Sequence, residues 1–444
     1  MSVLSGKVPL IRKSVRIPSL SAIRIERIVM VFLIAFIILD GNTMWSYVLH
    51  SPIYGQGFGW ATGTFSLLVI LLSGKFPKDS RTVITLLFLV GALGFYALAT
   101  RYKTTSFISH FVIMFVCLYL LSASLYENRN MGFFLKTYSN IMMTIAVISL
   151  FFWIFGSLLN VLPGRREVTY FWADKYNPSY TYYYLYFENP LQNRGEAISR
   201  NLGVFPEAPG YACFLTLGML IDVVRRKDLM NPETIRKNTY RLLIWFITLL
   251  STGSSKGIII VLAVIALKYL FRKSNRPWKQ VLKSITCIIL FLAASAASIY
   301  VLEGKLSTGS GAIRIDDLQA GLKTWQQHPL FGAGYMNGDA IRANWKLWRD
   351  NEGLSMGLAV LLGYGGLFFL VLYFGAAVFA YKGDYFHCRK KEWIMVIVVL
   401  FTDLFISNGA FELLYIFIIA AAYASRRSRP VDLVELSNDI LSSI

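Results

Sequence analysis

The sequence predicts an all-α, polytopic membrane protein, and three observations indicate that class. Of the 444 residues, 55% are hydrophobic and only 16% are charged, whereas soluble proteins carry roughly a quarter charged residues. The mean hydropathy is +0.53. Apolar runs long enough to cross a hydrocarbon core of about 30 Å as a helix recur along almost the whole chain. The composition therefore excludes a soluble globular enzyme and a disordered chain.

About twelve apolar segments fit membrane-spanning helices. They lie near residues 28–47, 58–73, 82–100, 106–125, 138–159, 209–224, 242–250, 257–271, 284–301, 354–376, 393–406 and 411–424. Between the short seventh segment and the eighth, we expect a break in the helix at residues 251–257, where protein or water must cover the backbone. The whole chain, residues 1–444, is thus interpreted as a single membrane domain.

The distribution of Lys and Arg predicts the orientation. Basic residues gather in both tails, 1–27 and 425–444, and in the connectors of one face, which the positive-inside rule assigns to the cytoplasm. Two long loops remain on the outer face, at residues 162–207 and 302–353. The net charge of +19 therefore reflects membrane orientation, and no nucleic-acid partner is expected.

Cysteine chemistry is not expected in the outer loops. The four cysteines fall in spans or on the cytoplasmic side: Cys117, Cys213, Cys287 and Cys388. This placement leaves no pair for a disulfide or a thiolate metal site outside.

The first outer loop mixes cations with aromatic rings. Its cations are Arg165, Arg166, Lys175, Arg194 and Arg200, and its rings include Tyr170, Phe171, Trp172, Tyr176, Tyr180, Tyr182, Tyr183, Tyr184, Tyr186 and Phe187. Rings stack on sugar faces and guanidinium groups bind phosphate in bidentate geometry, so the mixture suits a phosphate-bearing glycan. Alternatively, the rings form an interfacial belt or a loop core. Glu207 ends the loop at the start of the next span.

The second outer loop predicts a helix that rests on the membrane surface or on the protein body. Ser310 is expected to cap it, and Arg314 and Asp317 lie one turn apart. Its apolar face carries Ile315, Leu318, Leu322 and Trp325. Pro329 ends the helix after His328, and Gly332 and Gly334 permit tight turns. His328, the only histidine of the two loops, is either a cap for the last carbonyl groups or a catalytic residue.

Two further sets of cations are candidates. Arg342, Lys346 and Arg349 follow helical spacing beside Trp345 and Trp348, which predicts a short basic helix in the headgroup layer. It would hold the phosphates of a lipid substrate or merely anionic headgroups. Lys256, in LSTGSSKG, is the cation nearest the membrane interior on this face, and Asp403 and Glu412 in the last spans are candidates too. For these two acids, a structural salt bridge is the alternative.

Several segments together resemble the Wzy-type bacterial polysaccharide polymerases and the related O-antigen ligases. They are VFPEAPGYACFL, LSTGSSKG, RIDDLQAGLKTWQQHPLFGAGY and DNEGLSMGLAVLLGYGGLFFL, in this order. The resemblance implies transfer of a glycan from a polyprenyl-diphosphate carrier to an acceptor sugar on the outer face of the bacterial plasma membrane. A polymerase uses the next lipid-linked repeat unit as acceptor, and a ligase uses a lipid A core.

The departures from these families bear on the choice between them. Ligases usually carry a His-Asn pair where this chain reads Asp350, Asn351, Glu352 and Gly353, and the missing His favours a polymerase. The small-residue motif often carries Arg where this chain has Lys256, which keeps the charge and loses the bidentate fork. The polysaccharide is O-antigen, capsule or exopolysaccharide, and a chain-length regulator is an expected partner beside membrane lipids.

The site hypothesis assigns cations to the donor and carboxylates or His to the acceptor. A departing diphosphate needs positive charge, for which Arg200, Lys256, Arg314 and Arg342 are the main candidates, with Arg194 and Asn351 as further contacts. The general base is Glu207, His328 or Glu352. The outer loops contain no Asp-x-Asp or His/Asp cluster, so we expect neither a metal nor a cofactor.

Two rival functions remain at this stage. A flippase or transporter of lipid-linked sugars tends to contain internal repeats, but both long outer loops lie in the stretch from residue 162 onward and no self-similar halves are found. This asymmetry favours an enzyme. Another lipid-carrier glycosyltransferase, such as a protein O-glycosylating ligase, differs only in its acceptor.

Overall fold

The computed structural model describes residues 20–48, 52–74, 76–77, 79–172, 175–189, 199–224, 232–271, 278, 281–282, 285–286, 309–349, 353–383, 396–397, 399–400 and 409–425. Within these ranges, four helices are long and apolar enough to cross a membrane: Ser80–Thr100, Thr104–Glu127, Met131–Leu158 and Gly357–Lys382. Several shorter apolar helices accompany them. The mostly helical architecture agrees with the predicted class. The number of twelve spans stays a prediction, because segments 284–301 and 393–406 lie mostly outside the described residues.

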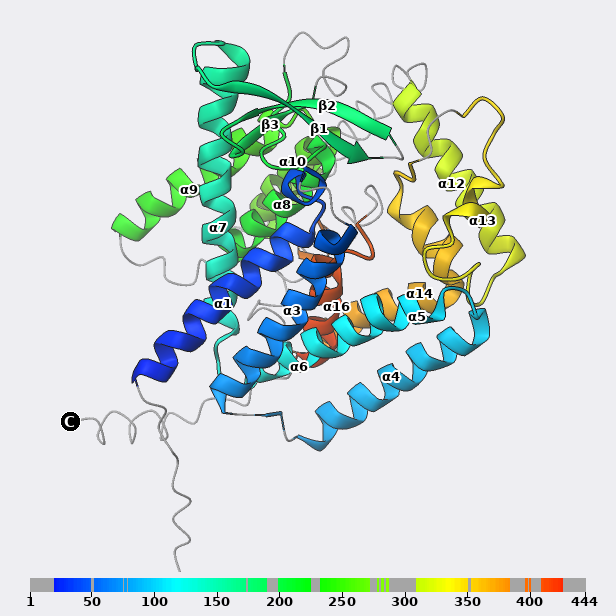
Figure 1. Cartoon of the computed structure of the whole chain (residues 1–444). Helices are drawn as coiled ribbons and strands as arrows, with labels where there is room; N and C mark the ends of the chain where they lie inside the picture. The colour runs from blue at the N-terminus through cyan, green and yellow to red at the C-terminus, as the bar shows by residue number, and fades with distance from the viewer. Residues whose placement is uncertain are drawn as a thin grey trace, which may run out of the picture.

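The helices follow the predicted apolar segments closely (Figure 1). The first half of the chain contains α1 (Leu20–Asp40), α2 (Met44–Val48), α3 (Pro52–Ser73), α4 (Ser80–Thr100), α5 (Thr104–Phe107), α6 (Ile113–Glu127) and α7 (Met131–Phe152). The second half contains α8 (Ala208–Val224), α9 (Pro232–Ser251), α10 (Ser255–Phe271), α12 (Gly309–Gln327), α13 (Gly338–Arg342), α14 (Gly357–Lys382) and α16 (Leu413–Ala424). Two π-helical turns, Ile108–Val112 and Trp153–Leu158, join α5 to α6 and extend α7.

Part of the first long loop is a β-sheet, so the all-α prediction is wrong for residues 165–188. Strands β1 (Arg165–Trp172), β2 (Lys175–Tyr182) and β3 (Tyr186–Glu188) form an antiparallel sheet in the order β1-β2-β3. The aromatic and β-branched residues of this stretch favour extended backbone, and pairing β1 with β2 satisfies their amide and carbonyl groups.

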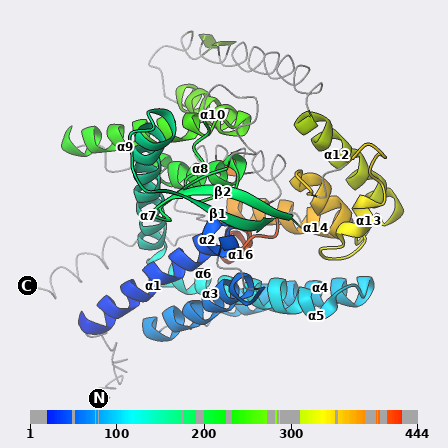
Figure 2. The same cartoon turned by 45° about the horizontal axis from the view of Figure 1, so that its top comes forward.

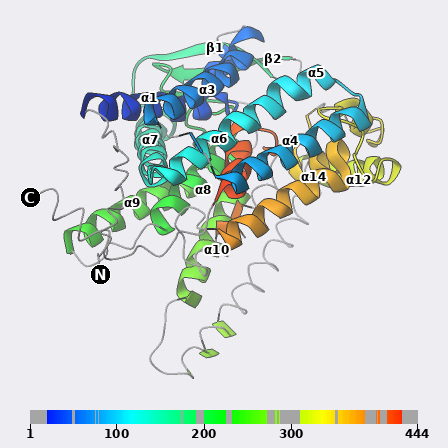
Figure 3. The ribbon, with the colours of Figure 1, turned by 90° about the horizontal axis from the view of Figure 1, so that it is seen from below.

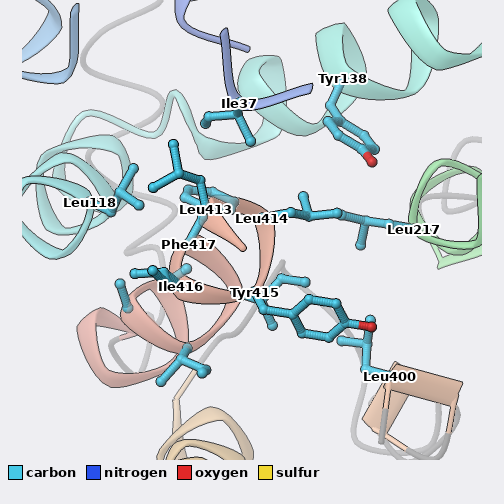
Figure 4. Close-up of a cluster of buried hydrophobic side chains, with 14 of the residues drawn as sticks. Ile37, Leu118, Tyr138, Leu217, Leu400, Leu413, Leu414, Tyr415, Ile416 and Phe417 are labelled. Atoms are coloured by element: carbon cyan, nitrogen blue, oxygen red, sulfur yellow. The ribbon is translucent and has the colours of Figure 1, made fainter. Parts of the chain in front are cut away.

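The centre of the bundle is α16, whose residues are all buried. Figure 4 shows it surrounded by Ile37 of α1, Leu118 of α6, Tyr138 of α7 and Leu217 of α8. A helix that is apolar on every side is suited to the core of a protein or to a membrane span, and the burial of every residue of α16 places it in the core. The last described helix therefore occupies the middle of the bundle, and the earlier helices enclose it.

Both long loops contribute to the same end of the bundle, which we call the sheet end. There the Met44 amide donates to the Val204 carbonyl at 2.7 Å, and the Trp45 indole donates to the Tyr184 carbonyl at 2.7 Å. The ring of Tyr102, between α4 and α5, packs against Gly334. Figures 1 and 2 show the sheet above the end of α1 and α12–α13 beside the end of α4. Residues from the two loops thus lie toward one end of the bundle, and the outward orientation of that end stays a prediction.

The helix predicted in the second loop is α12, and it packs on the protein body. Gly321 of α12 lies so close to Ala359 of α14 that an added Cβ would be 2.6 Å from the Ala359 Cα. Figure 3 shows α12 across the ends of α4, α5 and α14. Because the helix begins at Gly309, Ser310 lies inside its first turn, and the prediction that Ser310 caps the helix is wrong.

Helix α14 is broken at Gly366, where φ is 56° and ψ is −145°. The loop after α12 covers the break with its own backbone. The amides of Leu367 and Phe368 donate to the carbonyls of Pro329 and Leu330, both at 2.9 Å, and the Ala333 amide donates to the Gly363 carbonyl at 2.7 Å. Irregular backbone inside an apolar bundle persists only where protein satisfies it in this way. The motifs HPLFGAGY and GYGG are therefore two halves of one structural contact.

We expect Gly366→Ala to destabilise the protein. A Cβ at this position would lie 2.6 Å from the Gly332 nitrogen and 2.7 Å from the Pro329 carbonyl oxygen. Strained φ together with overpacking should lower the free energy of unfolding by about 2–4 kcal/mol. The measurement is thermal unfolding of the purified full chain in detergent. Gly94→Ala in α4 is the control, because its Cβ would meet nothing within 4 Å; equal unfolding midpoints for the two variants would contradict the interpretation.

Candidate functional site

The predicted phosphate ligand Arg200 lies against the break between α9 and α10. The helix ends at Ser251 and resumes at Ser255, which confirms the break expected there. Gly253 has a φ of +59°, and a Cβ on it would be 3.3 Å from the Cγ of Arg200. Lys256 follows in the first turn of α10, and its side chain lies outside the described part of the structure. The structure therefore places the Arg200 side chain at the turn that leads directly into Lys256.

Asn201 fixes this arrangement, although the sequence analysis did not identify it. Its side-chain amide donates to Ser149 Oγ at 3.2 Å and to Ser251 Oγ at 3.0 Å, and its Oδ1 accepts from the Gly203 amide at 3.1 Å. Its backbone amide donates to the Ser251 carbonyl at 3.0 Å. The residue is 0% exposed. One buried side chain thus joins α7, the segment that carries Arg200, and the end of α9.

Glu207 is half-buried where the first loop enters α8. The Tyr211 amide donates to its carbonyl at 3.2 Å, and its carboxylate lies within electrostatic range of Tyr47 and Tyr170. Burial raises the pKa of Tyr170 to about 12, although a hydrogen bond from Asn189 opposes the rise and Glu207 adds to it. Tyr170 therefore stays neutral at physiological pH and cannot serve as a base beside Glu207.

A chain of polar side chains connects α16 with the residue that precedes Glu207. Asn42 donates to Glu412 Oε1 at 2.9 Å and accepts from the Tyr47 hydroxyl at 3.0 Å. The rings of Tyr47 and Tyr170 meet edge to face at 6.2 Å. Asn189 then donates to the Tyr170 hydroxyl at 2.6 Å and to the Pro206 carbonyl at 3.1 Å. These contacts hold the start of α8 in place. Within them, Glu412 accepts its hydrogen bond from the neutral side-chain amide of Asn42.

The aromatic residues of the first loop divide into core and surface. Tyr170, Tyr182, Tyr186 and Phe187 are 0% exposed, so these rings form the core under the sheet, which was the alternative interpretation. Tyr176, Tyr183 and Tyr184 are exposed and remain available to a glycan. Arg165 pairs with Glu188 at 2.8 Å and stacks on Tyr180 at 4.0 Å.

The predicted basic helix at residues 342–349 is wrong. Helix α13 ends at Arg342, and turns follow through residue 349. The side chain of Arg349 is 1% exposed and pairs with Asp317 at 2.8 Å and with Asp316 at 3.2 Å. The two carboxylates on α12 pair with Arg349 in the interior, because a buried charge needs a counter-ion. This pairing is incompatible with the predicted helix at the membrane surface. Arg349 thus cannot reach a phosphate.

The other candidates differ in their surroundings. Arg314 is half-buried on α12 and makes no ion pair with any residue in the described ranges. Arg342 is 42% exposed and pairs with Asp339 at 3.4 Å. His328 is exposed at the end of α12, where its backbone amide donates to the Thr324 carbonyl at 3.0 Å and the Trp325 indole donates to the Pro329 carbonyl at 3.0 Å. Arg194, Asn351 and Glu352 lie outside the described residues.

The part of the chain that the structure describes contains no candidate metal site. No group of three or more His, Cys, Asp and Glu side chains there is arranged to hold a metal ion.

Compared with protein families, curated proteins and solved structures, the chain shows no match.

We expect Asn201→Ala to loosen the segment that carries Arg200. The change removes three hydrogen bonds of a fully buried side chain, which should cost about 1–3 kcal/mol of the free energy of unfolding. Thermal unfolding in detergent measures this effect. Asn140→Ala, on an exposed position of α7, is the matched control and should leave the midpoint near that of the wild type. A similar midpoint for Asn201→Ala would mean that these hydrogen bonds do not fix the segment.

Proposed function

We propose that the protein is a glycosyltransferase that polymerises polyprenyl-diphosphate-linked oligosaccharide repeat units into a surface polysaccharide. It would act at the outer face of the bacterial inner membrane, with both termini in the cytoplasm. The observation that carries the proposal is that both long loops contribute to one end of a largely apolar bundle, with Arg200 at the turn before Lys256. A lipid-linked donor reaches such a site from the bilayer without leaving it.

The reaction requires positive charge where the donor breaks. The acceptor hydroxyl oxygen forms a bond to the anomeric carbon, the bond from that carbon to the diphosphate oxygen breaks, and the diphosphate leaves with the bonding electrons. Fixed cations that face the developing charge lower this barrier. Arg200, Lys256, Arg314 and Arg342 would supply them in place of a divalent ion, with Arg194 and Asn351 as further contacts.

The acceptor hydroxyl must lose its proton as the new bond forms. Of the two proposed bases within the described ranges, Glu207 has the more favourable surroundings: it is half-buried at the sheet end, beside the segment that carries Arg200. Glu352, the third candidate, lies outside these ranges. A carboxylate there would take the proton directly. His328 lies in an exposed position at the end of α12, which suits solvent contact better than proton transfer in an enclosed site.

An assay on lipid-linked repeat units tests the proposal. The purified chain in liposomes should convert them into a ladder of products in the presence of EDTA, because no metal is required. One added unit on a lipid A core acceptor, without a ladder, would identify a ligase. Movement of the substrate across the bilayer without any new glycosidic bond would identify a flippase.

We expect Arg200→Ala and Arg314→Ala to preserve expression and to abolish the ladder, because each removes a charge that stabilises the departing diphosphate. Arg314→Lys should restore only part of the activity, since the bidentate fork is lost. Arg81→Ala, on an exposed position of α4 outside both long loops, is the control and should retain the ladder. A wild-type ladder from Arg314→Ala would exclude Arg314 from the site.

We expect Glu207→Gln to lower the rate of transfer about 10²- to 10⁴-fold, the usual contribution of a general base. The variant keeps the size of the side chain and removes its negative charge, and with it the ability to take a proton. Transfer rates in the liposome assay measure the effect. Glu167→Gln on exposed β1 and His328→Ala should both stay near the wild-type rate. If His328→Ala alone lost activity, the base would be His328.

A further inference from the structure

The buried ion cluster on α12 unites one cation with two anions. Arg349 is 1% exposed, and the side chains of Asp316 and Asp317 are 2% and 0% exposed. Arg349 also donates to the Gly353 carbonyl at 2.8 Å and the Ile313 carbonyl at 3.2 Å, and its guanidinium stacks on Trp345 at 3.9 Å. A guanidinium with this many acceptors is committed to the interior.

Both carboxylates receive further hydrogen bonds, one set from the second loop and one from Ser355 just after it. The backbone amide and the hydroxyl of Ser355 both donate to Asp317 Oδ2 at 2.7 Å. The Lys346 amide donates to Asp316 Oδ1 at 3.3 Å. These bonds and Arg349 hold the two acids in the interior, because each bond satisfies a lone pair that water has left.

Arg314 is the natural competitor for these acids. It lies three residues before Asp317 on the same helix, a spacing at which oppositely charged side chains are neighbours. Nevertheless, Asp317 pairs with Arg349, which comes from a separate segment, and Arg314 forms no ion pair within the described ranges. Among the described residues, one arginine therefore pairs with the acids, and the other has no counter-ion.

We infer that Arg349 is the counter-ion that keeps Asp316 and Asp317 away from Arg314, so that Arg314 stays available for an external anion of the diphosphate class. The inference rests on the proposed function only for the identity of that anion. Arg349 is thus a positioning residue: it does not touch the anion, and it acts by determining which arginine the two acids bind.

Chemical modification of arginine tests this role without any assay of transfer. The full chain in detergent is treated with phenylglyoxal, and modified positions are mapped by mass spectrometry. Arg314 should react in the wild type, and pyrophosphate should protect it. In R349Q, the reaction at Arg314 should fall about threefold, because a partly exposed ion pair with Asp317 now forms. The triple variant R349Q/D316N/D317N should return it to the wild-type level.

Arg342 is the internal control, since it is exposed in its own pair with Asp339 and should react equally in every variant. Equal modification of Arg314 in the wild type and in R349Q would overturn the inference. If R349Q does not fold, the triple variant decides: wild-type reactivity at Arg314 supports the counter-ion role, and reduced reactivity overturns it. Failure of pyrophosphate to protect Arg314, with the pattern among variants intact, would support the counter-ion role and contradict the proposed diphosphate site.

Discussion

The requirement that every buried backbone group find a hydrogen-bond partner organises the sheet end. Three helices are interrupted there, and each interruption is covered by protein. The Met44 amide after the first break donates to Val204, Asn201 binds the end of α9, and the loop at 329–334 pairs with α14 around Gly366. Inside an apolar bundle, no other source of hydrogen bonds is close at hand. The hydrogen bonds that satisfy the interrupted helices therefore also fix the positions of the loops.

This constraint explains how loops can carry a site that demands fixed geometry. Catalysis by charge stabilisation works when the charges are in position before the reaction starts. The position of Arg200 is fixed by the next residue, Asn201, whose side chain makes three hydrogen bonds. The position of Glu207 is fixed by the preceding residue, Pro206, whose carbonyl accepts a hydrogen bond from Asn189. In both cases the residue proposed to act is adjacent to one whose hydrogen bonds fix the backbone.

The sequence predicted the elements that depend on local composition. Apolar runs located the helices, and the small residues between α9 and α10 indicated the break that Gly253 makes. The sheet was missed because its rings were judged as loop or binding residues, although their mixture with Val168 and Thr169 favours strands. Arg349 was misplaced because its helical spacing says nothing about Asp316 and Asp317, which lie more than thirty residues away. Likewise, no local pattern distinguishes Asn201 from any other loop asparagine.

The covered break in α14 also bears on how the chain is made. Residues 329–334 leave the ribosome before residues 363–368. The loop is therefore made before the helix whose amides donate hydrogen bonds to its carbonyl groups. Asn201 differs, because its partners Ser149 and Ser251 flank it on both sides along the chain. Its second bond must wait until α9 has been synthesised. Synthesis runs from the N- to the C-terminus, so α16, the last described helix, is made after the helices α1, α6, α7 and α8 that surround it.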